Sequence, residues 1–165
     1  MLRISIERTI DSYSSYLVSK STYMKRTSLL LFILAALSTI SGYLLSKASL
    51  VGKAGISLFY KEYQFLKVWW QGALVVFGVL FLLFLAQGAF QRKAARGTAN
   101  FIHVLCILLA LAGLYFTYND FRHDLSHRLL GERFHLGAYL FWIGWMLVSL
   151  FFLAQKKAAR RLSRA

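Results

Sequence analysis

Residues 68–90 read VWWQGALVVFGVLFLLFLAQGAF, an apolar stretch of membrane-spanning length that contains no charged side chain. An α-helix needs roughly 20 mostly apolar residues to cross the hydrocarbon core of a bilayer. Three further stretches of the same character lie on either side of it, over residues 28–45, 101–118 and 134–154. The sequence therefore predicts an all-α integral membrane protein, a bundle of four transmembrane helices within residues 28–155.

The composition indicates the same class of protein independently. Hydrophobic residues make up 58% of the chain and its mean hydropathy is +0.55, both too apolar for an ordinary soluble domain. Four spans of about 20 residues use roughly half of the 165 residues, so only short loops and two tails remain. This leaves no room for a separate soluble catalytic domain. The sequence also has no Ser-His-Asp order, no paired intramembrane carboxylates and no metalloprotease helix motif, so we expect a protein that is not an enzyme.

The formal net charge of +14 is distributed unevenly along the chain. A soluble protein with this charge would suggest nucleic acid as a partner, but here the basic residues gather where the spans end. We therefore expect contacts with anionic lipid and no direct nucleic-acid binding. Thirteen of the twenty basic residues lie before the first span, between the second and third, or after the fourth: Arg3, Arg8, Lys20, Lys25, Arg26, Arg92, Lys93, Arg96, Lys156, Lys157, Arg160, Arg161 and Arg164.

This asymmetry predicts the orientation of the protein. Because cytoplasmic loops of membrane proteins are enriched in lysine and arginine, both termini and the loop between the second and third spans are expected in the cytoplasm. The expected location is the cell inner (plasma) membrane, with the mitochondrial inner membrane as the less favoured alternative. Residues 156–165 would then form a basic cytoplasmic tail.

Residues 1–27 predict a helix that lies in the cytoplasmic membrane surface. Their apolar members recur at spacings of four and three, which places them on one helical face: Leu2, Ile6, Ile10, Tyr13 and Leu17. A cleaved mitochondrial presequence is the alternative for this serine-rich segment. The acidic Glu7 and Asp11 argue against it, because presequences are poor in acidic residues.

The interiors of the four spans contain no aspartate, glutamate, lysine or arginine. A proton-coupled or cation-coupled carrier usually needs an ionisable group within the membrane, so this class of transporter is disfavoured. Small residues in every span would allow close approach between helices, either within this bundle or with a partner: Ser38, Gly42, Gly72, Gly78, Ala110, Gly113, Gly137 and Gly144.

Three kinds of residue within the third and fourth spans invite a functional interpretation. Trp142 and Trp145 share one helical face, and we expect them to pack between helices, with a lipid or quinone contact as the alternative. His103 is expected to form hydrogen bonds between helices rather than to act as a ligand. Cys106 is the single cysteine, so it cannot form an internal disulfide and is expected to be a small packing residue.

Reactive side chains concentrate between Asp120 and His135. His123 and His127 are four residues apart and share a face if this segment is helical. Such a pair can hold a divalent metal, and Asp124, Glu132 or His135 could complete the ligand shell. The alternative is a solvated connection whose acidic and basic side chains balance. Protonation of the three histidines as the pH falls would also suit an acid sensor.

Part of this segment resembles a known haem-binding signature. Residues His127, Gly131, Arg133 and Phe134 are similar to the His-x-x-x-Gly-x-Arg-His/Phe pattern of the cytochrome b membrane anchor of succinate dehydrogenase. The resemblance implies that His127 would ligate haem b, with Gly131, Arg133 and Phe134 at the following positions of the pattern. His135 is a further candidate ligand in the haem hypothesis, although it does not belong to the pattern. Another helix or subunit would have to supply the second axial ligand.

Three functional hypotheses follow. The first is a non-enzymatic, oligomeric membrane subunit that anchors, senses for or regulates a membrane complex, as accessory, immunity or defence components do; it would need no cofactor. The second is a redox anchor that binds haem b at His127 or His135 and a quinone near Trp142. The third is an oligomeric pore, for which a few polar residues in the spans are suitable: Ser38, Ser41, Gln71 and Gln87.

Overall fold

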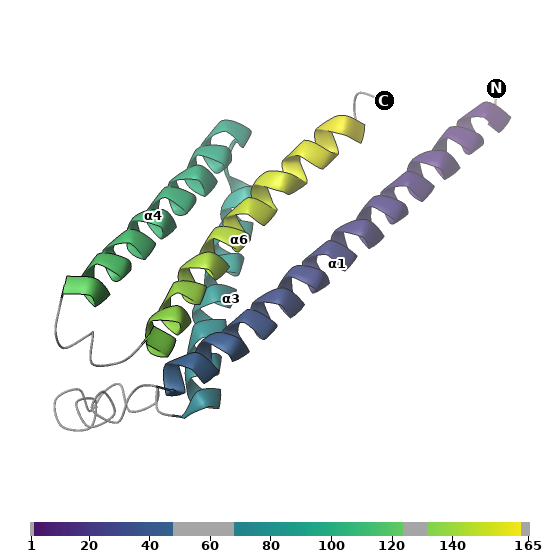
Figure 1. Ribbon diagram of the computed structural model, residues 1–165. Helices are drawn as coiled ribbons and strands as arrows, with labels where there is room; N and C mark the ends of the chain where they lie inside the picture. Colours follow the sequence, from purple (N-terminus) through teal and green to yellow (C-terminus); the bar gives the residue numbers. More distant parts are fainter. Residues whose placement is uncertain (1, 48–67, 124–131, 163–165) are drawn as a thin grey trace. The chain divides into compact units, whose positions relative to one another are not determined.

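The computed structural model describes residues 2–47, 68–123 and 132–162, and every regular element in them is an α-helix. In chain order these are α1 (Leu2–Ser46), α3 (Trp69–Lys93), α4 (Arg96–His123) and α6 (Glu132–Leu162) (Figure 1). Each contains a stretch long and apolar enough to cross a membrane: Ser21–Ser46, Trp69–Lys93, Gly97–Arg122 and Glu132–Gln155. The prediction of four helical spans is confirmed, and it fits a multi-pass membrane protein.

The chain divides into two compact units, residues 1–33 and 34–165. The first unit is the N-terminal part of α1. The helix has no end near residue 27, where the surface helix was expected to give way to the first span. Its location in the membrane surface therefore stays a prediction. The second unit, called the bundle below, contains the rest of α1 together with α3, α4 and α6.

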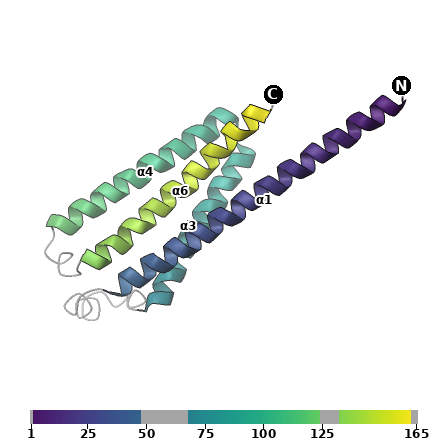
Figure 2. The same ribbon diagram turned by 45° about the vertical axis from the view of Figure 1, so that its right-hand side comes forward.

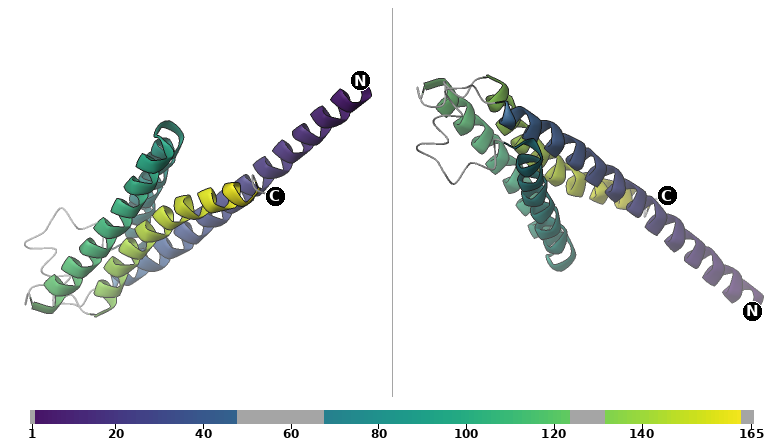
Figure 3. Two further views of the ribbon diagram at one scale, coloured as in Figure 1. Left: turned by 90° about the horizontal axis from the view of Figure 1, so that it is seen from above. Right: turned by 90° about the horizontal axis from the view of Figure 1, so that it is seen from below.

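Within the bundle, α6 packs against both α3 and α4, and most extensively against α4. Figures 2 and 3 show α4 and α6 running alongside each other in opposite chain directions. Most buried positions along each helix are three, four or seven residues apart, as a helix with one buried face requires. The apolar core of the bundle comprises Leu34, Leu45, Val76, Leu80, Ala99, Ala110, Phe134, Val148 and Phe152.

The opposite faces of these helices are also apolar, and they are exposed. Leu82, Leu108 and Phe116 lie on these faces, and each exposes more than half of its surface. A water-soluble bundle would place such side chains inside, whereas a bilayer solvates them as well as a protein core does. The distribution of apolar side chains therefore agrees with the spans.

Two glycines let helix backbones meet closely. A Cβ atom added to Gly42 of α1 would lie 2.3 Å from the backbone nitrogen of Ala73 in α3. One added to Gly137 of α6 would lie 3.0 Å from the carbonyl oxygen of Ser41. Only glycine fits at such crossings. The prediction of close approach is confirmed at these two positions, whereas Gly78 has nothing within 4 Å of an added Cβ and so marks no crossing.

The connection between α3 and α4 is very short. Lys93 ends α3, Ala94 adopts an extended conformation while its N–H donates to the Phe90 carbonyl, and α4 begins at Arg96. Such a short turn makes α3 and α4 antiparallel neighbours. We call this end of the bundle the turn end. The opposite end, where α4 finishes and α6 begins, is called the far end.

Candidate functional site

A cluster of polar side chains, three of them buried and one partly exposed, lies between α3, α4 and α6 near the turn end. Its members are Gln87 and Gln91 of α3, His103 of α4 and Ser149 of α6. Gln87 and Gln91 are one helical turn apart and so share a face. The short turn folds α4 back along α3, which brings His103 level with both amides. We call these four residues the polar cluster.

Hydrogen bonds join the members of the polar cluster across three helices. His103 Nδ1 lies 3.0 Å from Gln87 Oε1, and His103 Nε2 lies 2.9 Å from Gln91 Oε1. Gln87 Nε2 in turn donates to Ser149 Oγ at 3.0 Å. His103 and Ser149 are 0% exposed. In hydrocarbon each of these polar groups would cost several kcal/mol if left without a partner, so pairing them holds the three helices in register.

The hydrogen-bond pattern assigns a hydrogen to one nitrogen of His103. Ser149 Oγ accepts from Gln87 Nε2 and donates to the Trp145 carbonyl at 3.3 Å. Gln87 therefore presents its oxygen to His103, so Nδ1 carries a hydrogen and donates it. In a neutral imidazole Nε2 is then an acceptor, and the Gln91 amide turns its N–H toward it. In an imidazolium both nitrogens donate, and Gln91 accepts through Oε1.

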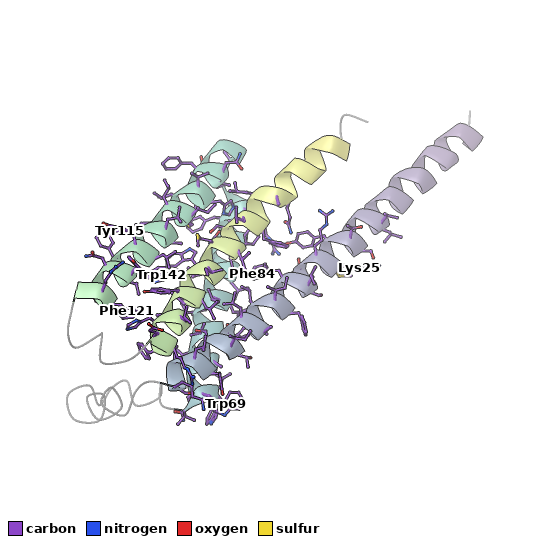
Figure 4. All side chains as sticks on the ribbon, viewed as in Figure 1. Lys25, Trp69, Phe84, Tyr115, Phe121 and Trp142 are labelled. Carbon is purple, nitrogen blue, oxygen red and sulfur yellow. The ribbon has the colours of Figure 1, made fainter. Side chains whose placement is uncertain are left out.

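An aromatic side chain covers the imidazole. The Phe152 ring lies parallel to that of His103, with centroids 5.3 Å apart and 9° between the planes. Phe84 of α3 stacks on Phe152 in turn, at 5.4 Å, and Figure 4 shows Phe84 beside α6. Because both ring nitrogens are bonded and one ring face is covered, His103 serves packing. The prediction of a histidine that hydrogen-bonds between helices is confirmed.

At the far end, aromatic side chains fill the interface between α4 and α6. The Phe121 ring stacks on the imidazole of His135, with centroids 4.2 Å apart. Deeper in the interface the Trp142 indole N–H donates to Thr117 Oγ1 at 3.0 Å, and Trp145 stacks on Trp142. Figure 4 shows Trp142 and Phe121 between the two helices. A Cβ atom added to Gly113 would overlap the Trp142 ring, so the packing of Trp142 between helices is confirmed.

The residues predicted for metal or haem binding have different outcomes. His127, Asp124 and Gly131 lie outside the described residues, and His123 is the last residue of α4. Glu132 and Arg133 are exposed in the first turn of α6. His135 packs against Phe121 as described above. Among the described residues no three metal-ligating side chains form a group, so metal binding, haem binding and acid sensing at this segment stay predictions.

Three of the four polar residues considered for a pore are buried in the structure. Gln87 is buried in the polar cluster, and Ser41 Oγ donates to the Gly137 carbonyl at 2.7 Å. Ser38 is buried too, although its hydroxyl has no hydrogen-bond partner among the described residues. These groups therefore lie between helices of one chain. The sequence does carry a signal for the polar cluster that the predictions above missed. Gln87 and Gln91 are four residues apart, and His103 follows just beyond a short basic connection.

Comparison of the chain with protein-family models, with curated proteins and with solved structures gives no match.

Proposed function

We propose that this chain is a non-enzymatic integral membrane subunit that anchors, senses for or regulates a membrane complex. It would contact its partners through its surfaces and would carry out no chemistry inside the spans. The observation that carries the proposal is that the side chains of the polar cluster form hydrogen bonds with one another. Gln87, His103 and Ser149 are buried, and Gln87 hydrogen-bonds to both of the others, so these side chains hold helices together. A carrier or a membrane enzyme instead keeps such groups available to a substrate.

The surfaces left for interaction support the same proposal. Exposed apolar faces run along α3 and α4, for example at Leu74, Leu82 and Leu108. They suit lipid, a second copy of the chain or the span of another protein. The basic residues flanking the spans suit anionic lipid at the cytoplasmic face of an inner membrane, with both termini inside. Self-association or other subunits would then complete the assembly.

The experiment is affinity purification of the full chain in mild detergent, with mass spectrometry and an absorption spectrum of the same sample. The proposal expects a colourless sample that contains other proteins in fixed stoichiometry, or an oligomer of the chain. A monomer without partners would contradict it. A Soret band that is lost in His127→Ala would replace it with the haem-binding anchor, and a single-channel conductance in planar bilayers would replace it with the pore.

The control variant is Gln87→Leu, which removes hydrogen bonds of the polar cluster. Gln87 is 2% exposed, so no exposed surface of the spans changes. If the spans act only as a scaffold, this change lowers the melting temperature of the purified assembly while the set of copurified proteins stays the same. A changed partner set at unchanged stability would mean that the cluster itself takes part in recognition.

A further inference from the structure

An apolar groove lies between α4 and α6 toward the far end. It has a volume of about 530 Å³ and is lined by Leu111, Leu114, Tyr115 and Tyr118 of α4 and by Tyr139 and Ile143 of α6. These residues belong to the candidate spans Gly97–Arg122 and Glu132–Gln155. A groove on the outside of two spans opens to the hydrocarbon of the bilayer, so its occupant must be apolar where it touches the walls.

A positively charged side chain, that of Arg122, lies at the far end of this groove. Arg122 lies one helical turn beyond Tyr118, and residues 111, 115, 118 and 122 share one face of α4. The Arg122 guanidinium donates a hydrogen bond to the Tyr118 hydroxyl. Its central carbon lies 5.8 Å from the centroid of the Tyr118 ring. Two interactions with a wall residue therefore hold the positive charge where the span ends.

The combination of apolar walls and a terminal guanidinium selects an amphipathic ligand. The walls suit a hydrocarbon chain parallel to the helices, and a guanidinium binds phosphate oxygens through paired N–H donors. Arg122 is exposed and ends the candidate span, which is the depth at which phospholipid phosphates lie. A phospholipid carries an acyl chain and a phosphate in one molecule. A free phosphate would not use the groove, and a hydrocarbon without a headgroup would not use Arg122.

We infer that the α4–α6 groove is a binding site for one phospholipid, with an acyl chain between Tyr115 and Ile143 and the phosphate on Arg122. The site lies at the far end, apart from the basic residues near the turn. Asp120 falls on another side of α4 from Tyr118, two residues away. Arg122 is thus the charged residue of α4 that continues the groove-lining face. The inference depends only on the membrane location of the chain and not on the proposed subunit role.

The test is native mass spectrometry of the full chain released from nanodiscs of phosphatidylglycerol and phosphatidylethanolamine. We expect one phospholipid to stay bound per chain at detergent concentrations that remove the rest. In Arg122→Gln the bound fraction should fall about tenfold, as expected for the loss of one charge-assisted hydrogen bond. Arg133→Gln removes the same charge from an exposed position on α6 and is the matched control, in which the bound fraction should stay within about twofold of wild type.

A second variant tests the walls of the groove without touching the charge. Ile143→Trp places a larger side chain in the groove and should also displace the lipid, whereas circular dichroism should show unchanged helix content. Equal retention by the wild type, Arg122→Gln and Ile143→Trp would overturn the site, as would a bound mass that is not a phospholipid. The partner proteins found by affinity purification do not enter either measurement, so the two proposals fail separately.

Discussion

Gln87 of α3 lies between two residues of other helices and bonds to both, and its Oε1 is 3.0 Å from Nδ1 of His103. The residue is 2% exposed. Its amide therefore connects α3 to α4 through His103 and to α6 through Ser149. We therefore expect the stability of the bundle to depend more on the Gln87 side chain than on a partly exposed glutamine near the end of a span.

Replacing Gln87 by leucine keeps the volume and removes both hydrogen bonds. It leaves the Nδ1 hydrogen of His103 without its acceptor in a site that water does not reach, so we expect a loss of about 1–2 kcal/mol in the free energy of unfolding. Thermal unfolding of the purified protein in detergent measures the change. Gln71→Leu is the control, because Gln71 is partly exposed in the first turn of α3 and should change stability little. Equal effects of the two variants would contradict the role given to Gln87.

Gly42→Ala should destabilise the bundle. The new methyl carbon would lie within 2.7 Å of three backbone atoms of α3, which cannot move aside as a side chain can, and overpacking of this kind costs about 1–3 kcal/mol. At Gly78 the same substitution meets nothing within 4 Å, and alanine is the better helix former by roughly 1 kcal/mol. The midpoints of thermal unfolding should therefore move in opposite directions. A stabilising effect at Gly42 would show that α1 and α3 do not cross there.

Two serines of α1 should respond differently to alanine. Ser41→Ala loses the hydrogen bond to the Gly137 carbonyl, a loss of about 0.5–1 kcal/mol in a membrane protein. Ser38→Ala removes a buried hydroxyl that has no hydrogen-bond partner among the described residues, so stability should stay the same or rise. Unfolding of both variants in one detergent makes the comparison. The interpretation fails if Ser38→Ala is the more damaging of the two.

The orientation predicted from the basic residues is open to cysteine labelling. In a Cys106→Ser background, a cysteine at Ala95 in the α3–α4 turn should react with a membrane-impermeant maleimide only after the cells are permeabilised. A cysteine at Lys47, exposed just after α1, should react in intact cells. The reverse pattern would invert the topology and place both termini outside.

The four spans could be predicted because their signal is local. A run of about 20 apolar residues without charge has few structural options, and all four runs are helices. The continuity of α1 through residue 27 also has a local reason that we did not use: no glycine or proline occurs before Gly42, so nothing ends the helix earlier. A change in amphipathic character does not by itself end a helix.

The contacts between helices were harder to predict. In a soluble bundle the apolar face of each helix identifies the core, but here the exposed and buried faces are both apolar, as at Leu82 and Leu80. Polar residues are the exceptions that reveal a buried face, and His103 was interpreted correctly for that reason. Its partners Gln87 and Gln91 belong to another helix, and the sequence does not state how α3 and α4 are rotated about their axes.

The measurement that tests the central claim most directly is native mass spectrometry of the protein ejected from its own membranes, without an affinity step. The mass of one chain is 18.9 kDa. A membrane subunit should appear as a multiple of that mass or together with other proteins in fixed ratio, and without the added mass of a haem. A single 18.9 kDa species carrying only lipid would contradict the account.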